Sequence, residues 1–110
     1  PLPELLDNKL SDTVNETLSF YLQGQSVEAI ATTRELKLTT IYGHLAEAIE
    51  AGLLDVRQVL ALEDQTYEEI VNTMELMAVC EEGRVKPVYE AYEGAYDYGV
   101  LKCIMASLCA

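Results

Sequence analysis

Residues 39–44 carry side chains whose types and spacing suit one defined chemistry, which is contact with nucleic acid. Threonine and tyrosine hydroxyls can bond phosphate oxygens, and threonine can also reach a base edge. A glycine such as Gly43 lets a sugar or a backbone come close. Two cations precede the run and could meet phosphates. The candidate nucleic-acid-binding residues are Arg34, Lys37, Thr39, Thr40, Tyr42, Gly43 and His44.

The surrounding residues, 26–52, have the apolar spacing of a helix-turn-helix. Its apolar positions are Ile30, Ala31, Leu36, Ile41 and Leu45. The small Ala31 permits a close second helix, and Leu36 closes the turn. With those positions buried, residues 39–44 would point outward at the start of a recognition helix. In this motif that helix enters the DNA major groove.

Two features weigh against a simple reading of this motif. Glu35 stands where the turn often has glycine, and glutamate tolerates positive φ poorly, so the turn is expected to be longer or differently shaped. Paired amphipathic helices also occur in domains that bind no DNA, and a lone histidine such as His44 is more often an ordinary residue than a ligand. The spacing alone therefore leaves DNA contact and a structural role both open.

The remaining reactive side chains do not predict catalysis. Cys80, Cys103 and Cys109 lack Cys-x-x-Cys spacing, so we expect three reduced thiols, with Cys103 buried in a helix, rather than a disulfide framework or a zinc site. The glutamate pairs 68–69 and 81–82 would point about 100° apart on a helix, as solvated charges do. Without a phosphate-binding loop, the chain is expected to be no enzyme and to hold no cofactor.

The elements that must position these residues are helices. Sustained alternation of Val, Ile and Thr, typical of strands, is absent. We predict an all-α fold, a compact domain of about seven short helices over residues 11–110, with a linker or arm at 1–10. The predicted capping residues are Thr13, Ser26, Thr39, Thr66 and Asp97, and a short helix should follow Asp55. The helix after Thr66 should turn Tyr67, Ile70, Val71, Met74 and Met77 inward.

Charge limits how strongly such a domain could hold DNA. Its 110 residues carry a net charge of −12, with 7 Lys and Arg against 19 Asp and Glu. The net charge is −2 over residues 26–52, −3 over residues 1–25 and −7 over residues 53–110. If Arg34, Lys37 and a protonated His44 met phosphates, the logarithmic salt slope would be only about −3. The sequence therefore predicts weak binding, useful when something else holds the DNA nearby.

Five blocks of sequence resemble one family. They are TVNET (13–17), GQSVEAIA (24–31), LTTIYGHLAEAIEAG (38–52), RVKPVYEA (84–91) and YDYGVLK (96–102). In this order they are spread over most of the span from residue 11 to residue 108. They are similar to the helix-turn-helix domain at the C-terminal end of many bacterial RecQ-type ATP-dependent DNA helicases.

The resemblance implies an accessory domain that serves DNA unwinding in repair and recombination. It implies single-stranded or forked DNA as the ligand and a cytoplasmic, nucleoid-associated location. ATP and magnesium would be needed only by motor domains elsewhere in the parent protein. The chain opens Pro-Leu-Pro-Glu without Met, which fits a piece of a longer polypeptide. The family's contact positions carry over to Thr39, Thr40, Tyr42, Gly43 and His44.

A protein-interaction module is the competing hypothesis. An acidic surface steers basic partners, such as repair proteins or the basic face of the domain's own helicase core. Homodimerisation through a face around Met74, Met77 and Met105 also stays open, although the sequence shows no zipper-like seam. The longest apolar stretches fall far short of the roughly 20 residues of a membrane span, so no membrane contact is expected.

Overall fold

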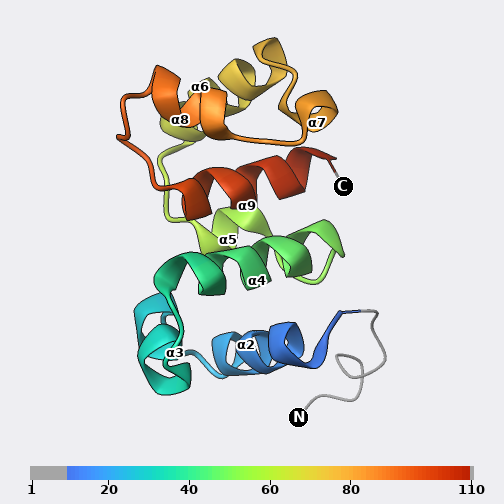
Figure 1. Cartoon of the computed structure of the whole chain (residues 1–110), viewed down its shortest axis with the longest axis vertical. Coiled ribbons are helices and arrows are strands. Elements are labelled where there is room, and N and C mark those ends of the chain that lie inside the picture. The colour runs from blue at the N-terminus through green and yellow to red at the C-terminus, as the bar shows by residue number, and fades with distance from the viewer. Residues whose placement is uncertain (1–9, 110) are drawn as a thin grey trace.

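The computed structural model describes residues 10–109, and all regular structure among them is helical (Figure 1). The helices are α2 (Asp12–Leu22), α3 (Val27–Arg34), α4 (Leu38–Glu50), α5 (Val56–Val59), α6 (Asp64–Leu76), α7 (Val79–Glu82), α8 (Lys86–Ala91) and α9 (Tyr98–Cys109). The all-α prediction is confirmed, with eight helices in this part of the chain against the seven expected. The predicted linker at 1–10 lies outside the described residues except for Leu10.

Helix α4 occupies the middle of the molecule. Helices α2 and α3 contact it from one side, and α9 lies along the other side (Figure 1). Beyond α9 lie α6, α7 and α8, and Tyr89 of α8 shares a hollow with Thr39 and Tyr42 at the start of α4. The contact between α4 and α9 is the most extensive between any two helices described. The helix-turn-helix is thus built into the body of the domain.

A main apolar core joins most of these helices, and a smaller cluster of Leu18 and Ala48 lies between α2 and α4. The fully buried large side chains of the main core include Ile30, Ile41, Leu45, Ile70, Met74, Leu101 and Ile104. Each such side chain contributes about 1.5–3 kcal/mol through its removal from water. The predicted inward positions of α3 and α4 are therefore confirmed. The prediction that Met77 points inward is wrong. Helix α6 ends at Leu76, and Met77 is 36% exposed.

Helix starts follow the sequence only in part. Ser26 caps α3 as predicted and accepts a bond from a backbone amide. The short helix expected after Asp55 is α5, and the Asp55 side chain caps it in the same way. Three other helices begin earlier than predicted, with Ser11, Lys37 and Glu63 as N-caps that make no side-chain cap bond. The predicted caps Thr13, Thr39 and Thr66 therefore lie inside their helices.

The short helix α7 was not predicted. Ala78 takes a left-handed conformation with φ of 52°, which ends the run of α6 and starts the four residues of α7. Gly83, with φ of 73°, ends α7 in turn. Four residues are too few to show a helical period in sequence, so this reversal has no clear signature.

Gly99 is where α4 and α9 come closest. A Cβ atom at this position would lie 2.5 Å from Cβ of Tyr42 and 2.6 Å from two of its ring atoms. Real side chains do not approach this closely, so only glycine fits. Gly43, one residue further along α4, has no neighbouring atom within 4 Å of its own Cβ position.

The two glycines make a matched test of this contact. We expect Gly99→Ala to destabilise the domain by about 1–3 kcal/mol, because the added methyl forces α9 away from Tyr42. Gly43→Ala should instead stabilise it by about 0.5–1 kcal/mol, since alanine favours a helix and meets no neighbour. Urea unfolding of both variants measures the difference, and equal stabilities would contradict the close packing.

The cysteines differ from the sequence prediction. Cys80 of α7 and Cys109 at the end of α9 form a disulfide, with their Cα atoms 5.5 Å apart, so the prediction of three reduced thiols is wrong. Spacing in sequence could not show this, because the pair is separated by 29 residues and brought together by the packing of α7 on α9. Cys103 is the free, buried thiol that was predicted, and burial raises its pKa to about 12.

Thiol titration tests the disulfide. The air-oxidised, denatured protein should present one reactive thiol, from Cys103, and three after reduction. Reduction should lower the free energy of unfolding by about 3–4 kcal/mol, because it frees a loop of this length in the unfolded chain. A Cys103→Ala variant that still shows a reactive thiol after oxidation would contradict the pairing.

Candidate nucleic-acid interface

The turn between α3 and α4 has three residues, Glu35 to Lys37. Glu35 adopts the left-handed conformation, with φ of 55°, in the place where this motif often has glycine. The backbone amide of Leu36 then donates to the Ala31 carbonyl at 3.0 Å, which closes the turn. The turn is therefore short, and the longer turn expected from Glu35 is not found. The cost of a left-handed glutamate is about 1–2 kcal/mol.

Helix α4 has only one face open to solvent. Ile41, Leu45 and Ala48 are buried, with α2, α3 and α9 packed around them. The open stripe runs along the opposite side and consists of Thr39, Thr40, Gly43, Ala46, Glu47 and Glu50. Its first turns are uncharged and its last turns are acidic. Only the beginning of α4 thus suits an approach by phosphate.

The N-terminus of α4 has free backbone donors. Lys37 is the N-cap and makes no side-chain cap bond, and the first turn of the helix contains no acidic residue. The first amides of a helix have no partner within it, and the helix dipole places partial positive charge there. Lys37 and Thr39 are both exposed, so a cation and a hydroxyl accompany these amides. This is the arrangement in which helices bind phosphate.

Gly43 is not required by the fold. It lies within α4, where a glycine costs about 0.5–1 kcal/mol relative to alanine. The space around its Cβ position is empty, so packing does not explain it. On the open stripe, one turn after Thr39, this gap lets a ligand backbone approach the helix closely.

Arg34 is placed differently from the sequence expectation. Its guanidinium donates to the Thr13 carbonyl at 2.7 Å and to the Thr13 hydroxyl at 2.9 Å, and it pairs with Glu16 at 3.3 Å. A further bond goes to the Thr17 hydroxyl. The Arg34 side chain is only 11% exposed. It holds α3 against α2 and has little capacity left for phosphate.

His44 is also turned toward α2. Its Nδ1 atom lies 2.8 Å from the hydroxyl oxygen of Thr17, which is fully buried. Since Arg34 already donates to that oxygen, the Thr17 hydroxyl proton is available to Nδ1 of a neutral ring. Burial, then the nearby Arg34 charge, lowers the pKa of His44, and Glu47 only partly opposes them. A neutral His44 adds no cation for phosphate.

Tyr42 faces α9. Its side chain rests on Gly99, and the Cys103 thiol donates to its backbone carbonyl at 3.6 Å. Burial, with smaller effects from nearby acidic groups, raises its pKa. The later tyrosines are half-buried and pair with one another, Tyr89 stacking on Tyr98 at 4.1 Å between ring centroids. They form a packed rim and no open platform for bases.

Lys102 is a residue that sequence reasoning missed. It is exposed on α9 and lines a groove of about 330 Å³ between α4 and α9. The other lining residues include Gly43, His44, Ala46, Glu47 and Glu50 of α4. Among residues 10–109 no ion pair engages Lys102. The close packing at Gly99 brings this cation beside the open stripe, and no local pattern in the sequence could show that.

The described part of the chain offers little for other ligands. No group of three His, Cys, Asp or Glu side chains within residues 10–109 could hold a metal ion. In the same range no helix has the length and apolar character of a membrane span.

The titration of His44 tests this arrangement. Because His44 is the single histidine of the chain, its ring proton resonance can be followed by NMR without overlap. We expect a pKa below the ordinary 6.5. Stability from the neutral ring is then present above pH 6.5 and lost as pH falls through the lowered pKa. Thr17→Val should change this titration, and a pKa above 6.5 in the parent protein would contradict the buried, neutral ring.

Of three comparisons with known proteins, one found a match, to a family model. No match to the chain was found among curated proteins or among solved structures. Residues 13–105 match the model of a family described as a helix-turn-helix domain, and this range runs from α2 into α9. The match suggests DNA binding in general terms. The chain belongs to this helix-turn-helix domain family.

Proposed function

We propose that this domain is an accessory DNA-binding module of a RecQ-type helicase. It would position single-stranded or forked DNA for unwinding in repair and recombination, through Lys37, Thr39, Thr40 and Gly43 on α4 and Lys102 on α9. The observation that carries the proposal is the start of α4, where free amides, a lysine and a hydroxyl lie beside a glycine that the fold does not need.

The link to RecQ-type helicases rests on sequence resemblance. The block at 38–52 contains the whole open stripe of α4, and the block at 96–102 contains both Gly99 and Lys102. The resemblance therefore includes the interface residues other than Lys37, together with the glycine that brings α9 beside them. ATP hydrolysis would belong to motor domains of the parent protein, and this domain would take no part in catalysis.

The charges of the interface fit a supporting role. Lys37 and Lys102 are its two available cations. Glu47 and Glu50 line the same groove as Lys102, and Asp97 lines the hollow beside Thr39. Two phosphate contacts give a logarithmic salt slope of roughly −2. Such binding is weak alone and gains strength when a motor holds the same DNA, because tethering raises the effective concentration. The contributions of Arg34, Tyr42 and His44 are to hold α4 in place.

Fluorescence anisotropy with a labelled forked oligonucleotide tests the proposal. At low salt we expect saturable binding whose salt slope falls by about 1 in Lys37→Gln and in Lys102→Gln. Thr40→Glu should abolish binding, because it places a carboxylate in the first turn of α4.

Lys86→Gln is the matched control. Lys86 is exposed on α8 and lines neither the groove of Lys102 nor the hollow beside Thr39, so its loss should change neither affinity nor slope by a comparable amount. If all three lysine variants lose affinity equally, the binding is unspecific attraction and the interface is refuted. A folded parent domain that binds no DNA at low salt would refute it as well.

A further inference from the structure

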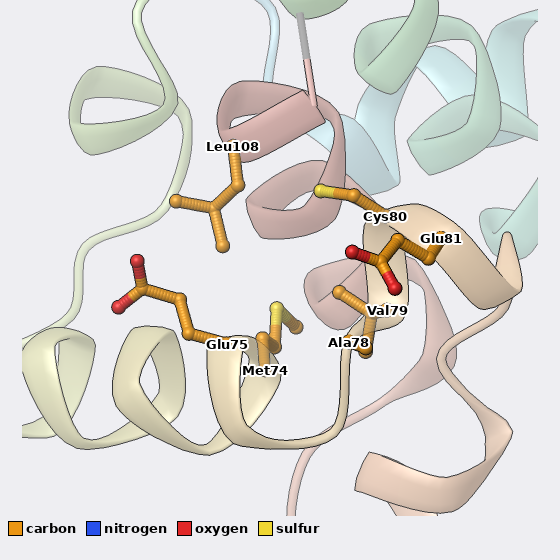
Figure 2. Close-up of a pocket in the computed structure, with 7 residues that line it drawn as sticks. All are labelled: Met74, Glu75, Ala78, Val79, Cys80, Glu81 and Leu108. Atoms are coloured by element: carbon orange, nitrogen blue, oxygen red, sulfur yellow. The ribbon is translucent and has the colours of Figure 1, made fainter.

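A second hollow lies on the other side of α9, where α6, α7 and the end of α9 meet (Figure 2). Its volume is about 240 Å³. The lining residues are Met74, Glu75, Ala78, Val79, Cys80, Glu81 and Leu108. Figure 2 shows apolar side chains between two carboxylates, with Glu75 on one side and Glu81 on the other.

The hollow is held open by packed elements. Met74 and Val79 in its floor are 0% and 2% exposed, so both belong to the core. The left-handed Ala78 fixes the reversal from α6 into α7. The disulfide from Cys80 to Cys109 ties α7 to the last turn of α9. The shape therefore does not depend on a ligand.

Two exposed apolar side chains adjoin the lining residues of this hollow in the chain. Leu76 is 89% exposed and Met77 is 36% exposed, and they stand in the chain between Glu75 and Ala78, both of which line the hollow. Leu76 is the most exposed of the large apolar side chains described. An apolar pocket with adjoining exposed apolar groups is typical of protein interaction surfaces.

The charge around the hollow is strongly negative. Residues 64–82 contain six carboxylates and no Lys or Arg. Among residues 10–109 the ion pairs are Arg34 with Glu16 and Arg57 with Asp64, so Glu75 and Glu81 are not neutralised. Half of the net charge of −12 therefore lies on residues 64–82, which contain α6 and α7.

We propose that this surface binds a basic, apolar-anchored segment of a partner protein. An apolar side chain of the segment would enter the hollow against Met74, Val79 and Leu108. Lysine or arginine residues beside it would contact Glu75 and Glu81. Nucleic acid does not fit, because its phosphates would meet unpaired carboxylates. A second copy of the domain fits poorly too, because it brings another twelve negative charges.

A synthetic fluorescein-labelled peptide of alternating leucine and arginine serves as the probe. The whole 110-residue chain should bind it saturably, and rising salt should weaken the binding. The double variant Glu75→Gln/Glu81→Gln should weaken it about tenfold through loss of the two charge contacts. Leu76→Ser should also weaken it, and this exposed side chain can change without disturbing the core.

Glu28→Gln/Glu90→Gln is the matched control, because it removes the same charge from exposed residues on α3 and α8. If both double variants weaken binding equally, only the overall charge attracts the peptide and the site is refuted. Equal binding of a peptide with serine in place of leucine would refute the apolar anchor. Self-association at the surface, shown by sedimentation and unaffected by the peptide, would refute the assigned partner.

The outcome is independent of the proposed DNA function. The double variant at Glu75 and Glu81 leaves the open stripe of α4 unchanged. It should therefore bind the forked oligonucleotide at least as well as the parent domain.

Discussion

The close approach of α9 to α4 at Gly99 determines what the rest of the domain can do. Because Gly99 has no side chain, α9 lies directly on Tyr42 and covers one flank of α4. Helices α2 and α3 cover another. The helix that would read DNA in a helix-turn-helix is therefore nearly surrounded, and one stripe remains. The same contact places Lys102 at the edge of that stripe. The packing of α9 on α4 therefore limits the size of the interface and also supplies one of its cations.

A polar network on the opposite flank has a complementary effect. Arg34 donates to Thr17, and Thr17 is bonded to His44, so one buried hydroxyl joins α2, α3 and α4. A buried hydroxyl needs such partners, since leaving it without them would cost about 1–3 kcal/mol. Two residues with the right chemistry for phosphate are thereby committed to the interior. What remains at the surface suits weak positioning of DNA better than independent binding.

Sequence reasoning found the helices because each buries an apolar stripe that recurs locally, as Ile41 and Leu45 do in α4. Periodicity reports that a face is buried, but it does not report how many neighbours cover the helix. Tyr42 was expected to point outward because α9, which covers it, arrives 57 residues later in the chain. For the same reason, local periodicity could not predict that Lys102 lies beside α4 or that Cys109 is the partner of Cys80. Threonine caps were misplaced because threonine hydroxyls also serve tertiary contacts, as Thr13 does with Arg34.

The net charge of −12 is distributed unequally between the two sides of α9. On one side lies the stripe of α4, with Lys37 at its start and Lys102 of α9 beside it. On the other side lie α6 and α7, where residues 64–82 hold six carboxylates and no Lys or Arg. The two candidate surfaces nevertheless share a wall. Leu108 lines the hollow beside α7, and the next residue, Cys109, lines the groove beside α4. Because the disulfide fixes Cys109 to α7, the last turn of α9 can shift only by changing both surfaces together.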